Sequence, residues 1–226
     1  MSYPRIERIN NKNIDEVTLK FYESDQSIKI NRSLCTGCSI CVKICPKEAI
    51  VQNRRGKVKV KTEDLIPEIP DAEKCSYCGA CAYMCPFSAI TLQKNGIPVA
   101  LEDIPIVKNK VVPKLDYEMV KCRKKGQIAK VYVEGEVSID WNSCISCLSC
   151  YEVCPNSAYF KAERKNKLSK PVKLDLNVRA ACLYCGACQT ACSQNAITVH
   201  INKIKHSGDY KEIFWSEIMK SIKGRR

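Results

Sequence analysis

The spacing of the cysteines constrains this sequence more than any other feature, because the pattern C-x2-C-x2-C-x3-C occurs four times in 226 residues. Of the 17 cysteines, only Cys122 lies outside these motifs. The motifs are Cys35, Cys38, Cys41 and Cys45; Cys75, Cys78, Cys81 and Cys85; Cys144, Cys147, Cys150 and Cys154; and Cys182, Cys185, Cys188 and Cys192. Proline follows the first three motifs, and Ser193 follows the fourth. The chain is therefore an internal repeat of four thiol-bearing loops.

This spacing has a direct chemical interpretation. Three thiolates that are two residues apart can surround one iron–sulfur cube from a tight loop, whereas the fourth has turned into a short helix and points away. In bacterial ferredoxins with this run, the fourth cysteine binds the other cluster of a pair. Zinc modules usually use two C-x2-C pairs joined by a longer loop. Four complete copies therefore predict four [4Fe–4S] clusters in interlocked pairs.

Two pairings of such motifs exist in known iron–sulfur subunits: neighbours may pair, or the set may nest, with the first motif completing the fourth and the second completing the third. The segment between the first two motifs has 29 residues (46–74), that between the last two has 27 (155–181), and the middle one has 58 (86–143). Motif starts repeat at offsets of 109 and 107 residues. The second and fourth motifs also share Tyr-Cys-Gly-Ala-Cys. We favour a duplicated two-motif unit, and hence pairing of neighbours.

Neighbour pairing assigns every ligand. Cluster one takes Cys35, Cys38, Cys41 and Cys85, and cluster two takes Cys75, Cys78, Cys81 and Cys45. Cluster three takes Cys144, Cys147, Cys150 and Cys192, and cluster four takes Cys182, Cys185, Cys188 and Cys154. Each iron then has a protein thiolate, so no position is open for the substrate that Lewis-acid catalysis requires. We expect no catalytic residues and no enzymatic activity of the chain alone.

The predicted fold is α+β, with two tandem ferredoxin-like modules of the dicluster bacterial type. Alternating segments at Ile28-Lys-Ile30 and Val137-Ser-Ile139 predict strands that lead into cluster loops. A bridging strand or hairpin, with Gly126 and Gly135 as turn residues, is expected between the modules. The predicted parts are an N-terminal extension (1–27), the first module (28–97), the bridge (98–134), the second module (135–205) and a C-terminal amphipathic helix (206–226).

The C-terminal segment has helical periodicity. Its apolar stripe is predicted to consist of Ile213, Phe214, Ile218 and Ile222, with Asp209 as N-cap and Gly224 as the end of the helix. The stripe could pack on the chain's own core or dock on a partner, and the sequence leaves both open. Tyr77, Tyr151 and Tyr184 are expected to cover the clusters, and Cys122 to be a spare thiol.

The charge and the cysteines limit the cellular context. The formal net charge of +13 would suggest a nucleic-acid partner. Four oxidised clusters of about −2 each would reduce it to about +5, so we expect no nucleic-acid binding. The start, MSYPRIERINNKN, lacks an export signal, and no apolar stretch is long enough to span a membrane. We expect a cytoplasmic protein whose thiols bind metal.

The sequence resembles the archaeal polyferredoxins, and more narrowly the polyferredoxin subunits of tungsten or molybdenum formylmethanofuran dehydrogenase. The narrower resemblance comes from the run between Val112-Pro-Lys-Leu-Asp-Tyr and Tyr132-Val-Glu-Gly and from His206-Ser-Gly-Asp-Tyr-Lys-Glu-Ile-Phe-Trp. Those subunits commonly carry twice as many motifs, so this chain would be a short, four-cluster form. The resemblance implies relay of low-potential electrons in an anaerobic archaeon, between a redox donor or acceptor protein and a partner with a pterin-bound metal.

Three alternatives remain at this point. The chain could be the iron–sulfur subunit of another anaerobic redox complex, such as a hydrogenase. It could be an iron–sulfur enzyme, but it has no radical C-x3-C-x2-C run, phosphate-binding loop or catalytic triad. It could also be a nucleic-acid-binding module with structural metal, which would bind DNA or RNA in a salt-dependent way.

Overall fold

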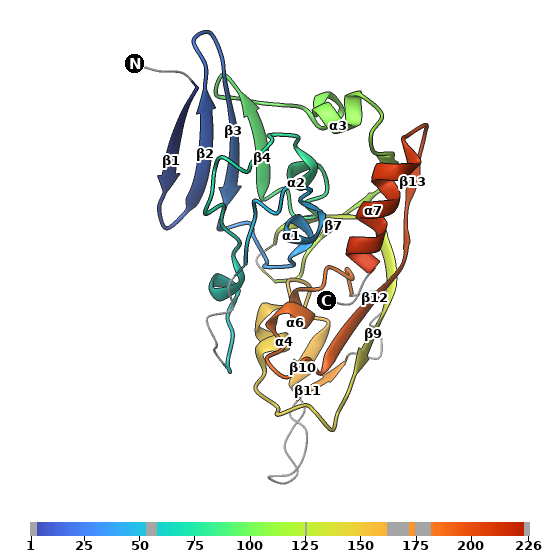
Figure 1. Cartoon of the computed structure of the whole chain (residues 1–226). Helices are drawn as coiled ribbons and strands as arrows, with labels where there is room; N and C mark the ends of the chain where they lie inside the picture. The colour runs from blue at the N-terminus through green and yellow to red at the C-terminus, as the bar shows by residue number, and fades with distance from the viewer. Residues whose placement is uncertain (1–3, 53–57, 125, 162–171, 175–181, 224–226) are drawn as a thin grey trace.

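The computed structural model of the chain describes residues 4–52, 58–124, 126–161, 172–174 and 182–223. Its first module, which contains the first two cysteine motifs, is built on a five-stranded antiparallel sheet (Figure 1). The strands in order are β1 (Arg5–Asn10), β2 (Ile14–Lys20), β3 (Asp25–Asn31), β4 (Ile90–Lys94) and β5 (Ile97–Pro98). The predicted strand at Ile28-Lys-Ile30 is confirmed as part of β3, and the N-terminal extension adds β1 and β2 to the same sheet.

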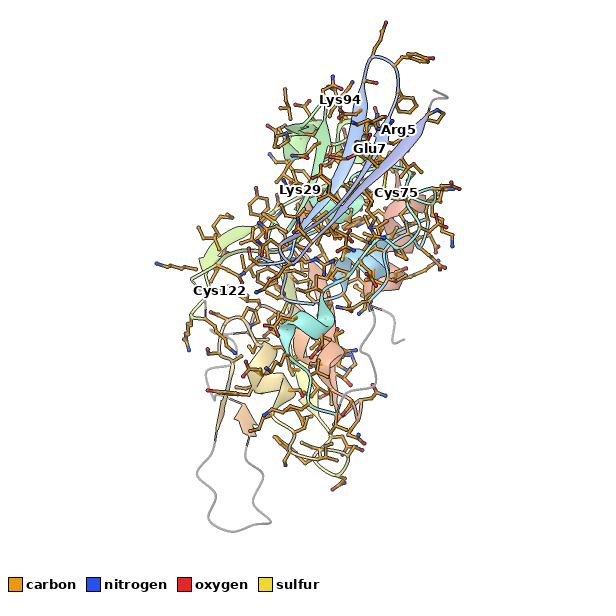
Figure 2. The ribbon with its side chains drawn as sticks, turned by 90° about the vertical axis from the view of Figure 1, so that its left-hand side faces the viewer. Arg5, Glu7, Lys29, Cys75, Lys94 and Cys122 are labelled. Atoms are coloured by element: carbon orange, nitrogen blue, oxygen red, sulfur yellow. The ribbon has the colours of Figure 1, made fainter. Side chains whose placement is uncertain are left out.

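The sheet has one apolar face and many charged side chains. Ile28 of β3 pairs with Leu92 of β4, and both are buried, because alternate side chains of a strand point to the same face. Charged side chains along the sheet include Arg5, Glu7, Lys29 and Lys94 (Figure 2). Lys20 and Glu7 are paired across β1 and β2 at 2.7 Å. The apolar face is thereby directed toward the cysteine loops.

The second module, which contains the last two motifs, has a shorter sheet. Strands β9 (Val133–Ile139) and β12 (Ile197–Ile204) are antiparallel, with an irregularity between Ile201 and Lys203. A second pair consists of β10 (Tyr159–Lys161) and β11 (Val172–Leu174). The predicted strand at 137–139 is confirmed as part of β9. Strands β3 and β9 thus lead into the first and third motifs, whereas β4 and β12 follow the second and fourth.

The bridge contains the predicted hairpin. Strands β7 (Glu118–Lys121) and β8 (Ile128–Val131) are antiparallel, and Gly126 lies in their turn with φ +61°. The prediction of Gly135 as a turn residue is wrong, because Gly135 lies inside β9 opposite Ile201. A Cβ atom on Gly135 would lie 2.1 Å from the backbone oxygen of His200, so this strand position has no room for a side chain.

Shorter elements connect these sheets. Before the hairpin come η1 (Thr62–Leu65), η2 (Leu101–Asp103) and α3 (Pro105–Lys108), and β6 (Lys114–Leu115) pairs with β13 (His206–Ser207). Each cysteine motif contains one short helix: α1 (Ile40–Ile44), α2 (Ala80–Tyr83), α4 (Ser149–Val153) or α6 (Ala187–Ala191). The β6–β13 pair brings the end of the second module back to the bridge.

The C-terminal helix α7 (Glu212–Lys223) packs on the chain's own core. Trp215, Ile218 and Ile222 are buried in the same apolar cluster as α1 of the first module. Phe214 packs partly against this cluster, but the predicted stripe is wrong at Ile213, which is 85% exposed. Asp209 is not the N-cap, because the helix begins at Glu212; Gly224 lies outside the described residues. Helix α7 therefore joins the two modules, since it also contacts β12.

Candidate metal centres

The four cysteine motifs share one backbone conformation. In each motif the residue directly after the second cysteine has a positive φ angle, and a short helix begins at the next residue. These residues are Ser39, Gly79, Leu148 and Gly186, with φ of 63°, 79°, 67° and 84°. The third cysteine therefore lies in the first turn of the helix, as the expected turn into a short helix requires.

Two further positions in every motif have positive φ angles. The first position lies two residues after the first cysteine and is occupied by Gly37, Tyr77, Ser146 and Tyr184. The second position lies three residues after the fourth cysteine and is occupied by Glu48, Ser88, Ser157 and Asn195. A non-glycine residue in this conformation costs about 1–3 kcal/mol and is found mainly at functional sites. The same costly conformation in four copies indicates that the loops are shaped around a common ligand. Ser193, which replaces proline in the fourth motif, leaves this turn unchanged at Asn195.

The fourth cysteine of each motif accepts a hydrogen bond that the sequence analysis missed. Its sulfur accepts the backbone N–H of the alanine four residues later. The pairs are Ala49 to Cys45, Ala89 to Cys85 and Ala158 to Cys154, each at 3.3 Å, and Ala196 to Cys192 at 3.2 Å. The signal in the sequence was the alanine itself, which recurs at this position in all four motifs. N–H groups directed at sulfur are a means of stabilising a bound iron–sulfur cluster.

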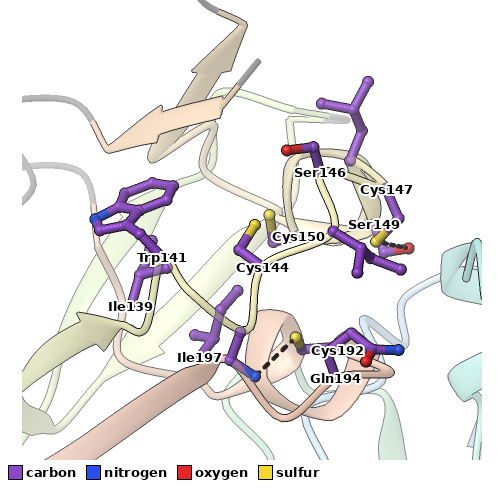
Figure 3. A pocket seen from close by; sticks show the side chains of 13 residues that line it. Ile139, Trp141, Cys144, Ser146, Cys147, Ser149, Cys150, Cys192, Gln194 and Ile197 are labelled. Carbon is purple, nitrogen blue, oxygen red and sulfur yellow. Dashed lines mark hydrogen bonds between the residues drawn. The ribbon is translucent and has the colours of Figure 1, made fainter. Parts of the chain in front are cut away.

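The sixteen motif cysteines line four cavities, with four thiols in each. Cavity one is lined by Cys35, Cys38, Cys41 and Cys85, and cavity two by Cys75, Cys78, Cys81 and Cys45. Cavity three is lined by Cys144, Cys147, Cys150 and Cys192, and cavity four by Cys182, Cys185, Cys188 and Cys154. Figure 3 shows the thiols of cavity three around a shared space. In every cavity, three thiols come from one motif and the fourth comes from its neighbour.

Burial raises the pKa values of these thiols. It raises the pKa of Cys35 to about 12 and that of Cys75 to about 11, and the thiols of Cys85 and Cys45 respectively add to the effect. In the second module, burial likewise raises the pKa of Cys150 to about 12 and that of Cys182 to about 11. The thiols of Cys192 and Cys154, respectively, add to these shifts. A buried thiol loses its proton readily only where positive charge compensates the thiolate. Each cavity therefore suits a group that brings several cations.

The donor set fits a [4Fe–4S] cluster better than a single ion. Among the described residues, no three His, Cys, Asp or Glu side chains are close enough together to hold one metal ion. Zinc would require its ligand atoms about 2.0–2.3 Å from one point. The thiols of each cavity instead surround a space, as four thiolates bound to four different irons must.

Within each module, the two cavities adjoin. Cys41 of cavity one has a pKa well above its ordinary value because of burial, and Cys81 of cavity two contributes to this shift. Burial likewise raises the pKa of Cys188 in cavity four to about 12, and Cys150 of cavity three adds to it. The Tyr159 hydroxyl acts on Cys188 in the opposite direction, although it makes no hydrogen bond of ordinary geometry.

The two modules meet between cavities one and four. The pKa of Cys185 is raised well above its ordinary value, first by burial and next by Cys38 of cavity one. Beside these cysteines, the hydroxyls of Ser39 and Thr190 are hydrogen-bonded at 3.1 Å. Both cysteines also pack against an apolar cluster that contains Val60 and residues from both modules. The four cavities therefore follow one another in the order two, one, four, three.

Tyr132 fills this junction. Its side chain is 1% exposed, and its hydroxyl donates a hydrogen bond to the backbone oxygen of Met84. Burial raises the pKa of the Tyr132 phenol well above its ordinary value, and Cys38, Cys85 and Cys185 act in the same direction. The aromatic ring therefore lies among thiols of cavities one and four. In the sequence, Tyr132 is part of the run that carries the family resemblance, and no role was predicted for it.

Other residues singled out in the sequence have different positions. Tyr77 lines cavity two and Tyr184 lines cavity four, as expected for covering residues. Tyr151 packs against the apolar cluster that contains Cys154 and Cys188, and its ring lies 5.8 Å from the ammonium of Lys124. Cys122 lies apart from Cys75 (Figure 2) and is buried in an apolar cluster with Phe87. It is not among the residues that line the four cavities.

Comparisons with known proteins agree with this site. Residues 34–89 and 143–196 match a family of 4Fe-4S dicluster domains, and a second family with the same description matches residues 71–158. The chain therefore contains tandem 4Fe–4S dicluster domains of the ferredoxin-like class, and this confirms the predicted fold class.

One solved structure extends the similarity over nearly the whole chain. It is a chain of the formate dehydrogenase–heterodisulfide reductase–formylmethanofuran dehydrogenase complex from Methanospirillum hungatei. The two chains superpose with a TM-score of 0.77 and 20% sequence identity, over 98% of this chain and 92% of that chain. At this level of identity the similarity shows a common fold. A comparison with curated protein sequences gave no significant match.

The described part of the chain has no helix that is both long enough and apolar enough to cross a lipid bilayer.

Proposed function

We propose that this chain is an electron-transfer subunit that holds four [4Fe–4S] clusters, one in each cavity. The observation that carries the proposal is the division of sixteen cysteines into four cavities of four thiols each. The ligands of clusters one to four are then the thiols of cavities one to four. Pairing of neighbouring motifs is supported by the fourth thiol of each cavity, which comes from the adjacent motif.

A bound [4Fe–4S] cluster supplies low-potential, one-electron chemistry. The chain supplies the thiolates, directs backbone N–H groups at the sulfurs and excludes water. Ile28, Ile50 and Ile69 line cavity two, and Ile139 and Ile197 line cavity three. With four protein thiolates in every cavity, no coordination position is left for a substrate, which supports a role without catalysis by the chain itself.

The order of the cavities supports a linear relay. Electrons that enter at cavity two or cavity three would reach the other end only through cavities one and four. Cys38 of cavity one and Cys185 of cavity four pack against the same apolar cluster where the two modules meet, and the buried Tyr132 lies beside them. The relay thus has two terminal sites, each suited to a different partner.

We further propose that the chain works inside a larger oxidoreductase in the cytoplasm, with formylmethanofuran dehydrogenase as the preferred complex. The sequence resemblance and the common fold with a chain of the Methanospirillum hungatei complex support this choice. Its reaction would be the reduction of carbon dioxide that begins methanogenesis, or the reverse. Another anaerobic complex, such as a hydrogenase, is the second candidate, because dicluster domains recur in many redox assemblies.

The experiment that tests the complex is anaerobic affinity purification of the tagged chain from its native cells. We expect a subunit with a pterin-bound tungsten or molybdenum to co-purify, and the mixture to reduce viologen with formylmethanofuran whereas the isolated chain does not. Co-purification of a nickel–iron subunit instead would select the hydrogenase. Recovery of the chain with nucleic acid at moderate salt would contradict both.

A further inference from the structure

Three buried hydroxyl groups in the described part of the chain lack a hydrogen-bond partner. They belong to Thr36, Tyr77 and Tyr159, whose side chains are 4%, 4% and 3% exposed. A buried hydroxyl without a partner is unfavourable and rare in native structures. Thr36 and Tyr77 therefore lack an acceptor among the described protein atoms, and the group that interacts with the Tyr159 hydroxyl is the sulfur of Cys188, itself a thiol of cavity four.

The three hydroxyl-bearing side chains belong to three different cavities. Thr36 lines cavity one, Tyr77 lines cavity two and Tyr159 lines cavity four. Two of them come from within a cysteine loop, whereas Tyr159 comes from β10. One such donor thus belongs to the lining of each of three cavities, and a cluster held in the cavity would provide sulfur atoms as acceptors beside it.

Cavity three has its own hydroxyl at Ser149, which is fully buried. Its oxygen accepts the backbone N–H of Val60 at 2.9 Å and lies 3.4 Å from the sulfur of Cys147 (Figure 3). As a free thiol, Cys147 donates to this oxygen. As a thiolate ligand, Cys147 has no proton to donate, so the hydroxyl hydrogen of Ser149 is directed at the sulfur.

We propose that these four hydroxyls each donate a hydrogen bond to a sulfur of the cluster in their cavity and so raise its reduction potential. The proposal rests on the proposed function. Reduction changes the charge of a cluster from about −2 to about −3, so an O–H···S bond becomes stronger in the reduced state. Thr36, Tyr77, Ser149 and Tyr159 are thus positioning residues that act on the potential without binding iron.

The test compares Tyr77→Phe and Tyr159→Phe with the wild-type holoprotein in potentiometric titrations followed by electron paramagnetic resonance. Each variant loses one oxygen atom. We expect one of the four clusters to become about tenfold harder to reduce, which is about 59 mV for a one-electron couple. Thr36 also borders an open polar groove with Lys61 and Glu152, so the tyrosines give the cleaner variants.

Tyr83→Phe is the matched control. The hydroxyl of Tyr83 donates to the backbone oxygen of Pro113 and accepts the N–H of Leu115, and Tyr83 lines none of the four cavities. All four potentials should therefore be those of the wild type. For cavity one, Thr36→Val should lower one potential and Thr36→Ser, which keeps the hydroxyl, should restore it.

A full complement of iron with wild-type potentials in both Tyr→Phe variants would overturn this proposal and leave the proposed function intact. If a variant loses a cluster, the wild-type protein provides the second measurement. Besides the backbone N–H protons directed at the fourth cysteines, electron–nuclear double resonance should show a coupled hydroxyl proton at the reduced clusters that exchanges rapidly in D2O, and its absence would also overturn the proposal. A wild-type protein without iron and sulfide would instead contradict the proposed function.

Discussion

Replacement of Cys45 by Ala is expected to remove about four irons per chain, because cavity two loses its fourth thiolate while cavity one keeps all of its own. The effect is large because a cluster that lacks one protein ligand exposes an iron to solvent. Iron and sulfide analysis after anaerobic reconstitution measures it. The same loss is expected for Cys85→Ala, which removes the fourth thiolate of cavity one.

Double variants show which cluster has been lost. Adding Cys78→Ala to Cys45→Ala should cause little further loss, because both thiols line cavity two. Adding Cys38→Ala should double the loss to about eight irons, since Cys38 lines cavity one. If each motif bound its own cluster, these two results would be exchanged. In the nested arrangement, Cys45 would complete the cluster of the fourth motif. Adding Cys185→Ala to Cys45→Ala would then cause little further loss of iron, whereas adding Cys78→Ala would double the loss.

The second large effect is expected for Gly135→Ala. The new methyl carbon would lie 2.1 Å from the backbone oxygen of His200 and 3.3 Å from the ring of Tyr184, so β9 and β12 would have to separate. We expect a destabilisation of about 3 kcal/mol. For a chain of this size, that corresponds to a fall of about 6–12 °C in the unfolding midpoint. Circular dichroism of the anaerobic holoprotein measures the midpoint.

Gly96→Ala is the control for this variant. Gly96 has a φ of +72°, but no atom lies within 4 Å of a Cβ placed on it. Only the backbone conformation is then unfavourable, and the expected cost is about 1 kcal/mol. Equal midpoints for the two variants would show that the close contact at Gly135 does not limit stability.

The local structure of the cysteine loops could be predicted from the sequence, because it depends on residues that are close together in the chain. Two- and three-residue spacings determine which thiols share a loop, and the alternation at Ile28 and Ile30 is sufficient to indicate a strand. The fourth thiol of each cavity also matches the expected neighbour, since the segments between paired motifs have similar lengths.

Features that depend on distant contacts were not predictable in the same way. Gly135 resembles a turn residue in the sequence. In the structure it lies in a strand, and glycine is required there because the backbone oxygen of His200 in β12 leaves no room for a side chain. Ile213 and Trp215 both fit a helical stripe, and only the surface of α1 and β12 determines that Trp215 is buried. The position of Cys38 near Cys185 depends on how the two modules pack against each other. The spacing of the motifs contains no information about this packing.

The most direct test of the central claim is a coulometric titration of the anaerobic holoprotein, with iron and sulfide determined on the same sample. We expect about sixteen irons, about sixteen sulfides and uptake of about four electrons per chain, together with paramagnetic signals on reduction. A colourless protein that contains zinc, or one that takes up no electrons from dithionite, would contradict it.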